Sequence, residues 1–245
     1  MPIGRERCRA VVVLMATIAG VALTARLGFW QLDRAAQKIA IQAQIDARRA
    51  LPPLDGPALA DTPEKANEQH QRRASLRGRW VAARTVFLDN RQMNGVPGFF
   101  VVTPLQLEGR PQAVLVQRGW VPRNFSDRAA LPSVPAASGP VQVDGVVAPP
   151  PSRLYQFSVE ASGRIRQNLD LGAFSRETGL ALLPLSVLQS DSESTRGDGL
   201  QRRWPAPELD VSKHYGYAFQ WFAMACLMVG LYVWFQLIRP ARRPA

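Results

Sequence analysis

The chain has 245 residues and a formal net charge of +11, and its apolar residues are gathered at the two ends of the sequence. A basic balance is one sign of nucleic-acid binding, but many of the arginines lie in short terminal tails, and the middle segment interleaves Arg with Asp and Glu. Since no helix-turn-helix, zinc-finger or RNP pattern accompanies the charge, we exclude a nucleic-acid-binding protein.

The first predicted element is a transmembrane helix over residues 10–32, preceded by a basic tail (residues 1–9). The run 10–25 is uncharged, and Arg26 separates it from a further apolar stretch that ends at Trp30. About 20 apolar residues in helical form cross a bilayer core, and an arginine near the helix end reaches the headgroups with its long side chain. The competing interpretation is a cleaved signal peptide, which the lack of a small-x-small cleavage triplet disfavours.

Residues 33–71 are predicted to form a helical extension followed by a loop. Good helix formers continue the first helix to about Ala50, and Pro52-Pro53 then prevents its continuation. The polar stretch that follows has one expected helical turn, at Thr62–His70.

Residues 72–213 are predicted to form a mainly antiparallel β domain, closed as a barrel or a curled sheet. The expected strands are Ala74–Trp80, Thr85–Asp89, Phe99–Leu107, Ala113–Val121, Val141–Ala148, Tyr155–Ser158, Arg164–Leu169 and Leu182–Leu188. Turn residues between neighbouring strands favour a meander. One helix is expected at Leu171–Thr178, capped by Gly179. The stretches 122–140 and 190–199 are expected to be surface loops.

A second transmembrane helix is predicted over residues 214–238, with a basic tail at 239–245. Basic residues flank both helices on their tail sides, which predicts cytoplasmic termini and a periplasmic middle segment. Small residues at Ala16, Gly20 and Thr24 and at Ala218 and Ala225 predict that the two helices pack on each other. The fold class is therefore an α+β membrane protein, with two transmembrane helices flanking the β domain.

Three local patterns are candidates for a functional site. The first runs from Gly28 to Lys38, with Gln31, Arg34 and Lys38 on one helical face; the alternative is interfacial anchoring by Trp30 and the basic residues. The second is Arg118-Gly119-Trp120-Val121-Pro122 at a strand end, where the glycine permits a bulge; the alternative is a strand terminus with a stacked Arg–Trp pair. The third opens the second membrane helix with His214, Tyr217, Ala218, Gln220, Trp221 and Phe222; the alternative is a histidine that caps the helix or lies amphipathically at the headgroups.

These three patterns, in this order on a two-helix topology, resemble the surfeit-locus family of cytochrome c oxidase assembly factors. The resemblance spans Gly28 to Phe222. The family often carries an aromatic residue where this chain has Gln37 and an asparagine where it has Gln117, which weakens inference at those two positions. Because the first apolar run starts at Ala10, without a mitochondrial presequence, we expect a bacterial inner membrane.

The resemblance implies a chaperone that presents or stabilises haem a during assembly of a haem-copper oxidase. The implied partners are the catalytic subunit of cytochrome c oxidase and haem a synthase. The implied cofactor-binding residues are His214, as a ligand of the haem iron, and Tyr217, Trp221, Arg34, Lys38 and Arg118. The remaining motif residues, expected to be structural, are Gly28, Trp30, Gln31, Gly119, Trp120, Pro122, Ala218, Gln220 and Phe222.

An enzyme is not expected. Only two histidines are present, no hydrolase or nucleotide-binding motif occurs, and Cys8 and Cys226 form no Cys-x-x-Cys pair. The remaining alternative is a membrane-tethered periplasmic binding or interaction module that does not bind haem. Tails of this length leave no room for a cytoplasmic output domain, which argues against a signalling receptor.

Overall fold

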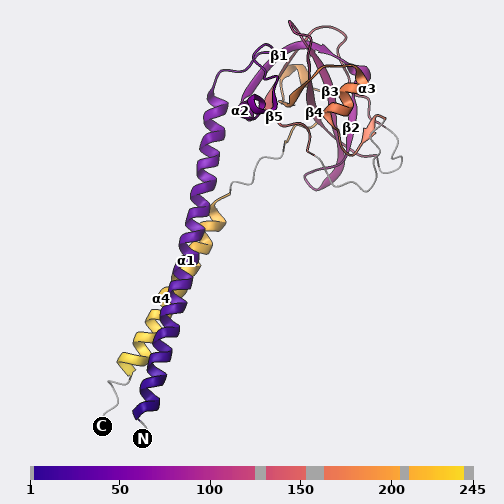
Figure 1. Ribbon diagram of the computed structural model, residues 1–245. Coiled ribbons are helices and arrows are strands. Elements are labelled where there is room, and N and C mark those ends of the chain that lie inside the picture. Colours follow the sequence, from indigo (N-terminus) through magenta and orange to yellow (C-terminus); the bar gives the residue numbers. More distant parts are fainter. Residues whose placement is uncertain (1–2, 125–130, 153–162, 205–209, 240–245) are drawn as a thin grey trace. The chain divides into compact units, whose positions relative to one another are not determined.

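The computed structural model describes residues 3–124, 131–152, 163–204 and 210–239, and for residues 3–6 it describes the backbone alone. The chain divides into two compact units (Figure 1). The helical unit comprises residues 1–44 and 207–245, and the β unit comprises residues 45–206. The predicted α+β class, with a long apolar helix at each end of a barrel-like β domain, is confirmed.

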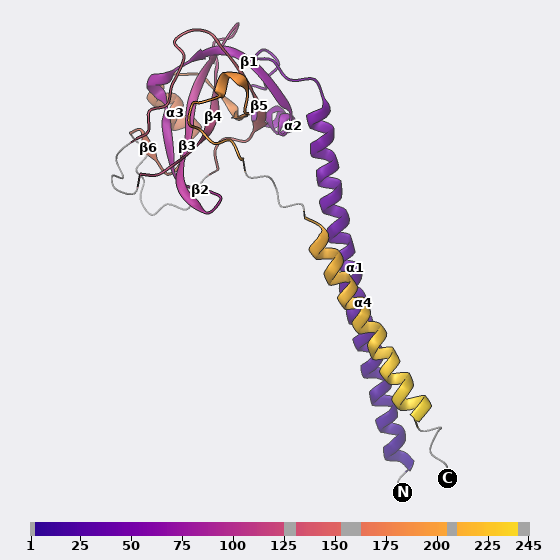
Figure 2. The same cartoon turned by 180° about the vertical axis from the view of Figure 1, so that it is seen from behind.

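The helical unit is built on α1 (Ile3–Ala50), a 48-residue helix, and on α4 (Ser212–Tyr232), which continues through a π-helical segment (Val233–Ile238). Both helices are long and apolar enough to cross a membrane. The predicted end of the first helix at Ala50 is confirmed. The two helices run antiparallel alongside each other in both views (Figures 1 and 2).

Small residues hold α1 and α4 together, as the sequence predicted. Thr24, Ala218 and Ala225 are buried between the helices. A Cβ atom added at Gly28 would lie 2.7 Å from ring carbons of Phe222, so only glycine permits this approach. Gly20 also lies on this face, since a Cβ atom there would be 2.9 Å from the sulfur of Met228. Ala16, in contrast, is exposed, and the neighbouring Thr17 is partly buried. The predicted packing is therefore confirmed for Gly20 and Thr24 and is wrong for Ala16.

The β unit contains seven strands among the described residues. They are β1 (Arg73–Trp80), β2 (Val86–Met93), β3 (Val96–Leu107), β4 (Ala113–Pro122), β5 (Val141–Ala148), β6 (Ile165–Arg166) and β7 (Leu182–Gln189). Two short helices accompany them, α2 (Pro63–Gln69) and α3 (Leu171–Thr178), with 3-10 turns at Ala82–Arg84 and Glu193–Thr195. The predicted strand Tyr155–Ser158 lies outside the described residues, and Arg164–Leu169 contributes only the two residues of β6.

The strands close into a ring, because β1 pairs with both β5 and β3. The order β1-β5-β7-β4-β3 returns to β1, and β2 and β6 extend the sheet beyond β3. The predicted meander is correct only for β2, β3 and β4. β7 instead inserts between β5 and β4, antiparallel to the first and parallel to the second, because its apolar side chains complete the core there. The sheet is thus mainly antiparallel, with parallel pairs at β4–β7 and β2–β6.

The core of the β unit lies inside this ring. Its largest cluster includes Leu76, Leu105, Val114 and Leu185, none of which has any exposed surface. Two further clusters form around Phe174 and around Phe87 with Phe99. Burial of a Leu or Phe side chain contributes about 1.5–3 kcal/mol, so these clusters dominate the stability of the unit.

Local signals in the sequence account for both short helices. Thr62 caps α2, with Pro63 at its first position, and Ala66 packs into the core. The Asp170 side chain accepts a hydrogen bond from the Ala173 amide at the start of α3, at 2.9 Å. Gly179 ends that helix at φ 72°, where glycine avoids the cost of a left-handed conformation.

Candidate functional site

His214 lies in the first turn of α4 and makes a side-chain contact with α1. Its Nδ1 atom is 2.7 Å from Oε1 of Gln31, a residue 183 positions away in the sequence. Both side chains are partly buried. The structure therefore joins one residue of the first sequence pattern to one residue of the third, by a hydrogen bond between the two helices.

The two cations of the first pattern have different surroundings. Nζ of Lys38 donates to the backbone oxygen of Asp210, just ahead of α4, at 3.3 Å. Arg34 is exposed; its guanidinium lies 5.6 Å from the Trp30 ring centroid and donates to Gln37 at 3.2 Å. Lys38 thus links α1 to the segment that leads into α4. The charge of Arg34 stays at the surface, and its side chain is oriented by the cation–π contact with Trp30 and the i,i+3 hydrogen bond to Gln37.

The residues that follow His214 divide between the interior and the surface of the helix pair. Ala218 is buried, and Phe222 packs against Gly28 and meets the Phe29 ring edge-on at 5.2 Å between centroids. Trp221 is partly buried, whereas Tyr217 and Gln220 are exposed. Ala218 and Phe222 are therefore packing residues, and Trp221 and Tyr217 remain predictions for ligand binding.

The second pattern belongs to the β unit, where it forms a bulge in β4. Gly119 pairs with Val101 and Gln117 with Val102, so Arg118 is the extra residue, as the glycine predicted. A Cβ atom on Gly119 would lie 2.6 Å from Cβ of Leu200. The glycine thus admits the chain at Leu200–Gln201, whose Gln201 exchanges two backbone hydrogen bonds with Trp120.

The neighbours of Arg118 in the pattern have structural roles. The indole Nε1 of Trp120 is buried and donates to the backbone oxygen of Arg91 at 2.9 Å. Pro122 is the last residue of β4 and pairs with Gly98. These contacts hold the end of β4 in place, and none of them involves a group that is available to a ligand.

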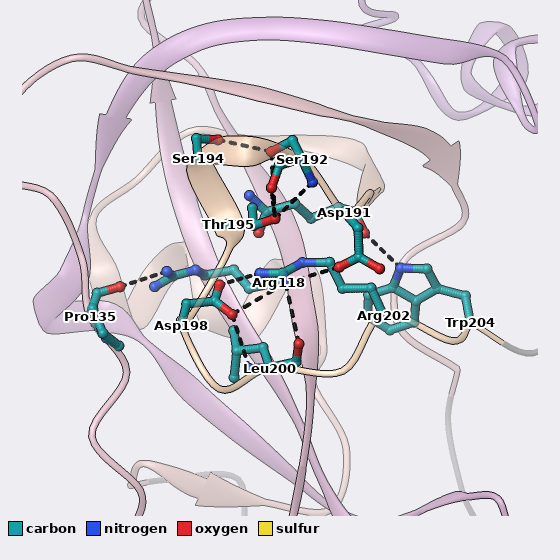
Figure 3. Close-up of polar contacts among 11 residues, drawn as sticks. Arg118, Pro135, Asp191, Ser192, Ser194, Thr195, Asp198, Leu200, Arg202 and Trp204 are labelled. Atoms are coloured by element: carbon teal, nitrogen blue, oxygen red, sulfur yellow. Dashed lines mark hydrogen bonds and ion pairs between the residues drawn. The ribbon is translucent and has the colours of Figure 1, made fainter.

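Arg118 itself is 5% exposed and stacks on Trp80, with its guanidinium carbon 4.7 Å from the ring centroid. Its Nη2 donates to the Pro135 oxygen at 2.6 Å, and Figure 3 shows the guanidinium pointing toward that carbonyl. Nε and Nη1 have no hydrogen-bond partner among the described residues. Burial lowers the pKa of Arg118 and the nearby Arg202 lowers it further, whereas the Asp198 carboxylate acts in the opposite sense.

The loop that carries Asp198 was expected to be a surface loop, and most of its residues are exposed, but it also pairs with a buried arginine. Arg202 is almost fully buried and makes ion pairs with Asp198 and Asp191, as drawn in Figure 3. A cavity of about 450 Å³ adjoins the loop, and Arg118, Trp80, Gln189 and Asp198 are among its lining residues. Polar composition alone did not reveal that the loop covers a buried arginine pair.

The other stretch expected to be a surface loop, 122–140, has no fully buried residue where it is described, but it also contacts the core. Leu131 and Val134 are partly buried against the cluster around Phe87, and Pro135 accepts the hydrogen bond from Arg118. Apolar residues among the prolines indicated such contacts, but the stretch lacks the periodicity of strands and helices, so these contacts were not predictable.

The three basic residues expected to bind the cofactor belong to different units. Arg34 and Lys38 are in the helical unit, and Arg118 is in the β unit. That all three bind one ligand stays a prediction. Within the helical unit, the arrangement supplies an imidazole with one nitrogen held by an amide, an aromatic neighbour at Trp221 and cations at Arg34 and Lys38. Among the described residues, no group of three or more His, Cys, Asp or Glu side chains is placed to hold a metal ion.

These observations define a class: a two-helix α+β protein whose helix pair fits a membrane and whose β unit is a small barrel. The SURF1 family model matches residues 18–226, which include the whole β unit and parts of both long helices. The chain belongs to the SURF1 family.

Three relatives are similar to this chain over different lengths. The SURF1-like protein of Rickettsia bellii is 25% identical over 214 residues, which cover 84% of this chain and 83% of that protein. The Arabidopsis thaliana protein named Surfeit locus protein 1 is 30% identical over 117 residues, 44% of this chain and 33% of the relative. The Saccharomyces cerevisiae protein named Cytochrome oxidase assembly protein SHY1 is 28% identical over 95 residues, 39% of this chain and 24% of the relative. The matches to the plant and yeast proteins thus span a third or less of those relatives.

Proposed function

We propose that this protein is an assembly factor for a haem-copper terminal oxidase, and that it presents or stabilises haem a for insertion into the catalytic subunit. Membership of the SURF1 family supports the assembly role, as does similarity to the yeast Cytochrome oxidase assembly protein SHY1. The observation that carries the haem role is the position of His214, at the head of α4, with Nδ1 held by Gln31. In this role the protein is a chaperone, not a catalyst.

The residues of the helical unit fit a haem as cargo. Imidazole is a common ligand of haem iron, and Nε2 of His214 makes no hydrogen bond within the described part of the chain. Trp221 supplies an aromatic surface one to two turns along α4, with Tyr217 near it on the same helix. Arg34 is an exposed cation suited to a propionate carboxylate, because arginine forms charge-assisted hydrogen bonds with carboxylates. Haem a supplies the redox-active iron of the oxidase that receives it.

We place the protein in a bacterial inner membrane, with both termini in the cytoplasm and the β unit in the periplasm. The antiparallel pairing of α1 and α4 supports this, since a helix pair that crosses the membrane twice brings its two ends back to one side. Basic tails flank that end. The proposed partners are the catalytic oxidase subunit and haem a synthase.

The test is an absorption spectrum of the full chain, purified in detergent from cells that make haem a. Wild type should carry haem, and His214→Ala should lose the haem absorption or shift it markedly. Arg34→Ala and Arg118→Ala should lower the haem content. His70→Ala is the matched control, because His70 is the other histidine and lies in the β unit, at the end of α2.

Two results would contradict the proposal. If wild type carries no haem, the protein is a membrane-tethered interaction module, and oxidase assembly must depend on contacts of the β unit. If His214→Ala keeps the wild-type spectrum, His214 is not part of the haem site, and its role is confined to the contact between the helices.

A further inference from the structure

The contact between Gln31 and His214 favours one of the two imidazole tautomers. The Gln31 amide is oriented with its oxygen toward His214, and an amide oxygen accepts hydrogen bonds and cannot donate them. In this orientation Nδ1 of a neutral imidazole, 2.7 Å away, is the donor. A neutral imidazole has one ring proton, so with that proton on Nδ1 the Nε2 atom keeps a free lone pair.

The tautomer with an unprotonated Nε2 is the one that can bind a metal through that nitrogen. Histidines that ligate metals through one nitrogen commonly donate the other N–H to a carbonyl, carboxylate or water, which fixes the tautomer and the ring orientation. Gln31 is placed to have this effect on His214. An imidazole that only anchors a helix at the headgroups requires no such partner.

The packing of the helices fixes the relative position of the two side chains. Gly28 and Phe29, one turn before Gln31, both contact Phe222 of α4. Lys38, two turns after Gln31, donates to the backbone of Asp210. Contacts on both sides of Gln31 therefore hold the axial register in which its amide faces the imidazole. Ala35, between them on α1, is fully buried.

We propose that Gln31 is a positioning residue that holds His214 in the Nδ1–H tautomer, with Nε2 presented to the iron of the haem. This inference rests on the proposed haem role. Gln31 would not touch the haem; it acts through the imidazole.

The primary experiment reads the tautomer directly, in the haem-free full chain in detergent. ¹⁵N-histidine labelling gives two pairs of ring-nitrogen signals, one pair for each of the two histidines in the chain, and His70→Ala assigns the pairs. Wild-type His214 should show an unprotonated Nε2 and a protonated Nδ1. Gln31→Ala should shift the signals toward the Nε2–H tautomer that a free imidazole side chain prefers, whereas Gln31→Glu should keep the wild-type tautomer because its carboxylate also accepts.

Gln37→Ala is the matched control on the same helix. Gln37 hydrogen-bonds to Asp33 and Arg34 and makes no contact with His214, so its removal should leave the His214 signals unchanged. Circular dichroism of each variant would verify that the helices form. If wild-type His214 carries its proton on Nε2, or if Gln31→Ala leaves the tautomer unchanged, the inference is wrong whether or not haem binds.

Haem titration provides the second readout. Loss of the partner of a ligating histidine typically weakens metal binding by about 10- to 100-fold, so Gln31→Ala should bind haem correspondingly more weakly, and Gln31→Glu should restore binding. Equal haem affinity of Gln31→Ala and wild type would overturn the presentation role. If the tautomer follows Gln31 as expected but wild type binds no haem, the proposed function has failed, and Gln31 and His214 form only a clasp between the helices.

Discussion

The helical unit buries a narrow stripe of small residues, whereas the β unit encloses three clusters of large apolar side chains. In the helices, Thr24, Ala218 and Ala225 are buried, and large side chains such as Phe219 point outward with 75% of their surface exposed. In the β unit, Phe87 and Leu115 have no exposed surface. The β unit is therefore stabilised by the removal of its apolar side chains from water. The helix pair depends instead on close packing of small residues and a few polar contacts, which is the usual way in which helices associate in a bilayer.

The two units also differ in how accessible their candidate ligand-binding cations are. The β unit buries two neighbouring arginines, Arg118 and Arg202, which bind carbonyl and carboxylate groups. The helical unit presents Arg34 and the head of α4 at its surface. A ligand can reach the second set without disturbing a core, which is why the helical unit is the better candidate for transient binding.

The largest expected effect separates a phenylalanine buried in the β unit from an exposed one on α4. Phe87→Ala should lower the free energy of unfolding of the β unit by about 3–5 kcal/mol, because a buried ring is lost and a cavity remains. Phe219→Ala should change it by less than about 0.5 kcal/mol. Urea titration of the full chain in detergent, followed by tryptophan fluorescence, measures both. If the two substitutions lowered the free energy of unfolding equally, the helical unit and the β unit would not unfold separately.

The second expected effect tests the helix pair alone. Gly28→Leu should force α1 away from Phe222, at a cost of about 1–3 kcal/mol for overpacking. The disulfide crosslinking yield between cysteines placed on α1 and α4 should fall, with the unfolding of the β unit unchanged. Gly230→Leu is the control, because no atom of the described structure lies within 4 Å of a Cβ there. A crosslinking yield equal to that of the control would show that Gly28 is not a contact point.

The smallest expected effect is a pH dependence at the surface of the β unit. Arg166 donates two hydrogen bonds to Glu177, at 2.8 and 2.6 Å, and these bonds lower the pKa of that carboxyl below its usual 4.5. The folded pKa is thus below the unfolded one, so the contribution is complete above pH 4.5 and is lost as the pH falls through the folded pKa.

Glu177→Gln should therefore be less stable than wild type at neutral pH, and the gap should close below pH 4.5. Because the Glu177 side chain is 38% exposed, the gap should not exceed about 1 kcal/mol. Urea titrations at several pH values measure it, with Glu108→Gln as the control for removing an exposed carboxylate. A gap that widens toward low pH would contradict the assignment.

Elements with strong local signals were predictable from the sequence. The bounds of β5 and α3 and the end of α1 match the predictions, since alternation, an Asp cap, a C-terminal glycine and a proline pair act within a few residues. The insertion of β7 between β4 and β5 was not predictable, because strand pairing depends on partners far apart in the chain.

The candidate site shows the same limit. The sequence placed Gln31 and His214 at the outer ends of two membrane helices, and hence at similar depth. Their contact also depends on the rotational phase of each helix, which Gly28, Phe222 and Lys38 set through packing. The surroundings of Arg118 could not be predicted either, because the 190–199 loop that covers it has no periodicity.

The place of β7 in the ring has a consequence for the order in which the β unit folds. β4 and β5 do not pair with each other, so the ring stays open until Leu182–Gln189, the last strand in the sequence, is available. Until then a nascent chain exposes two unpaired strand edges flanked by apolar side chains, and such edges favour association with other chains. Closure late in the sequence also raises the mean separation of contacting residues, which predicts slow folding for a domain of this size. The interval between synthesis of β5 and of β7 is thus the period in which this chain is most prone to aggregate.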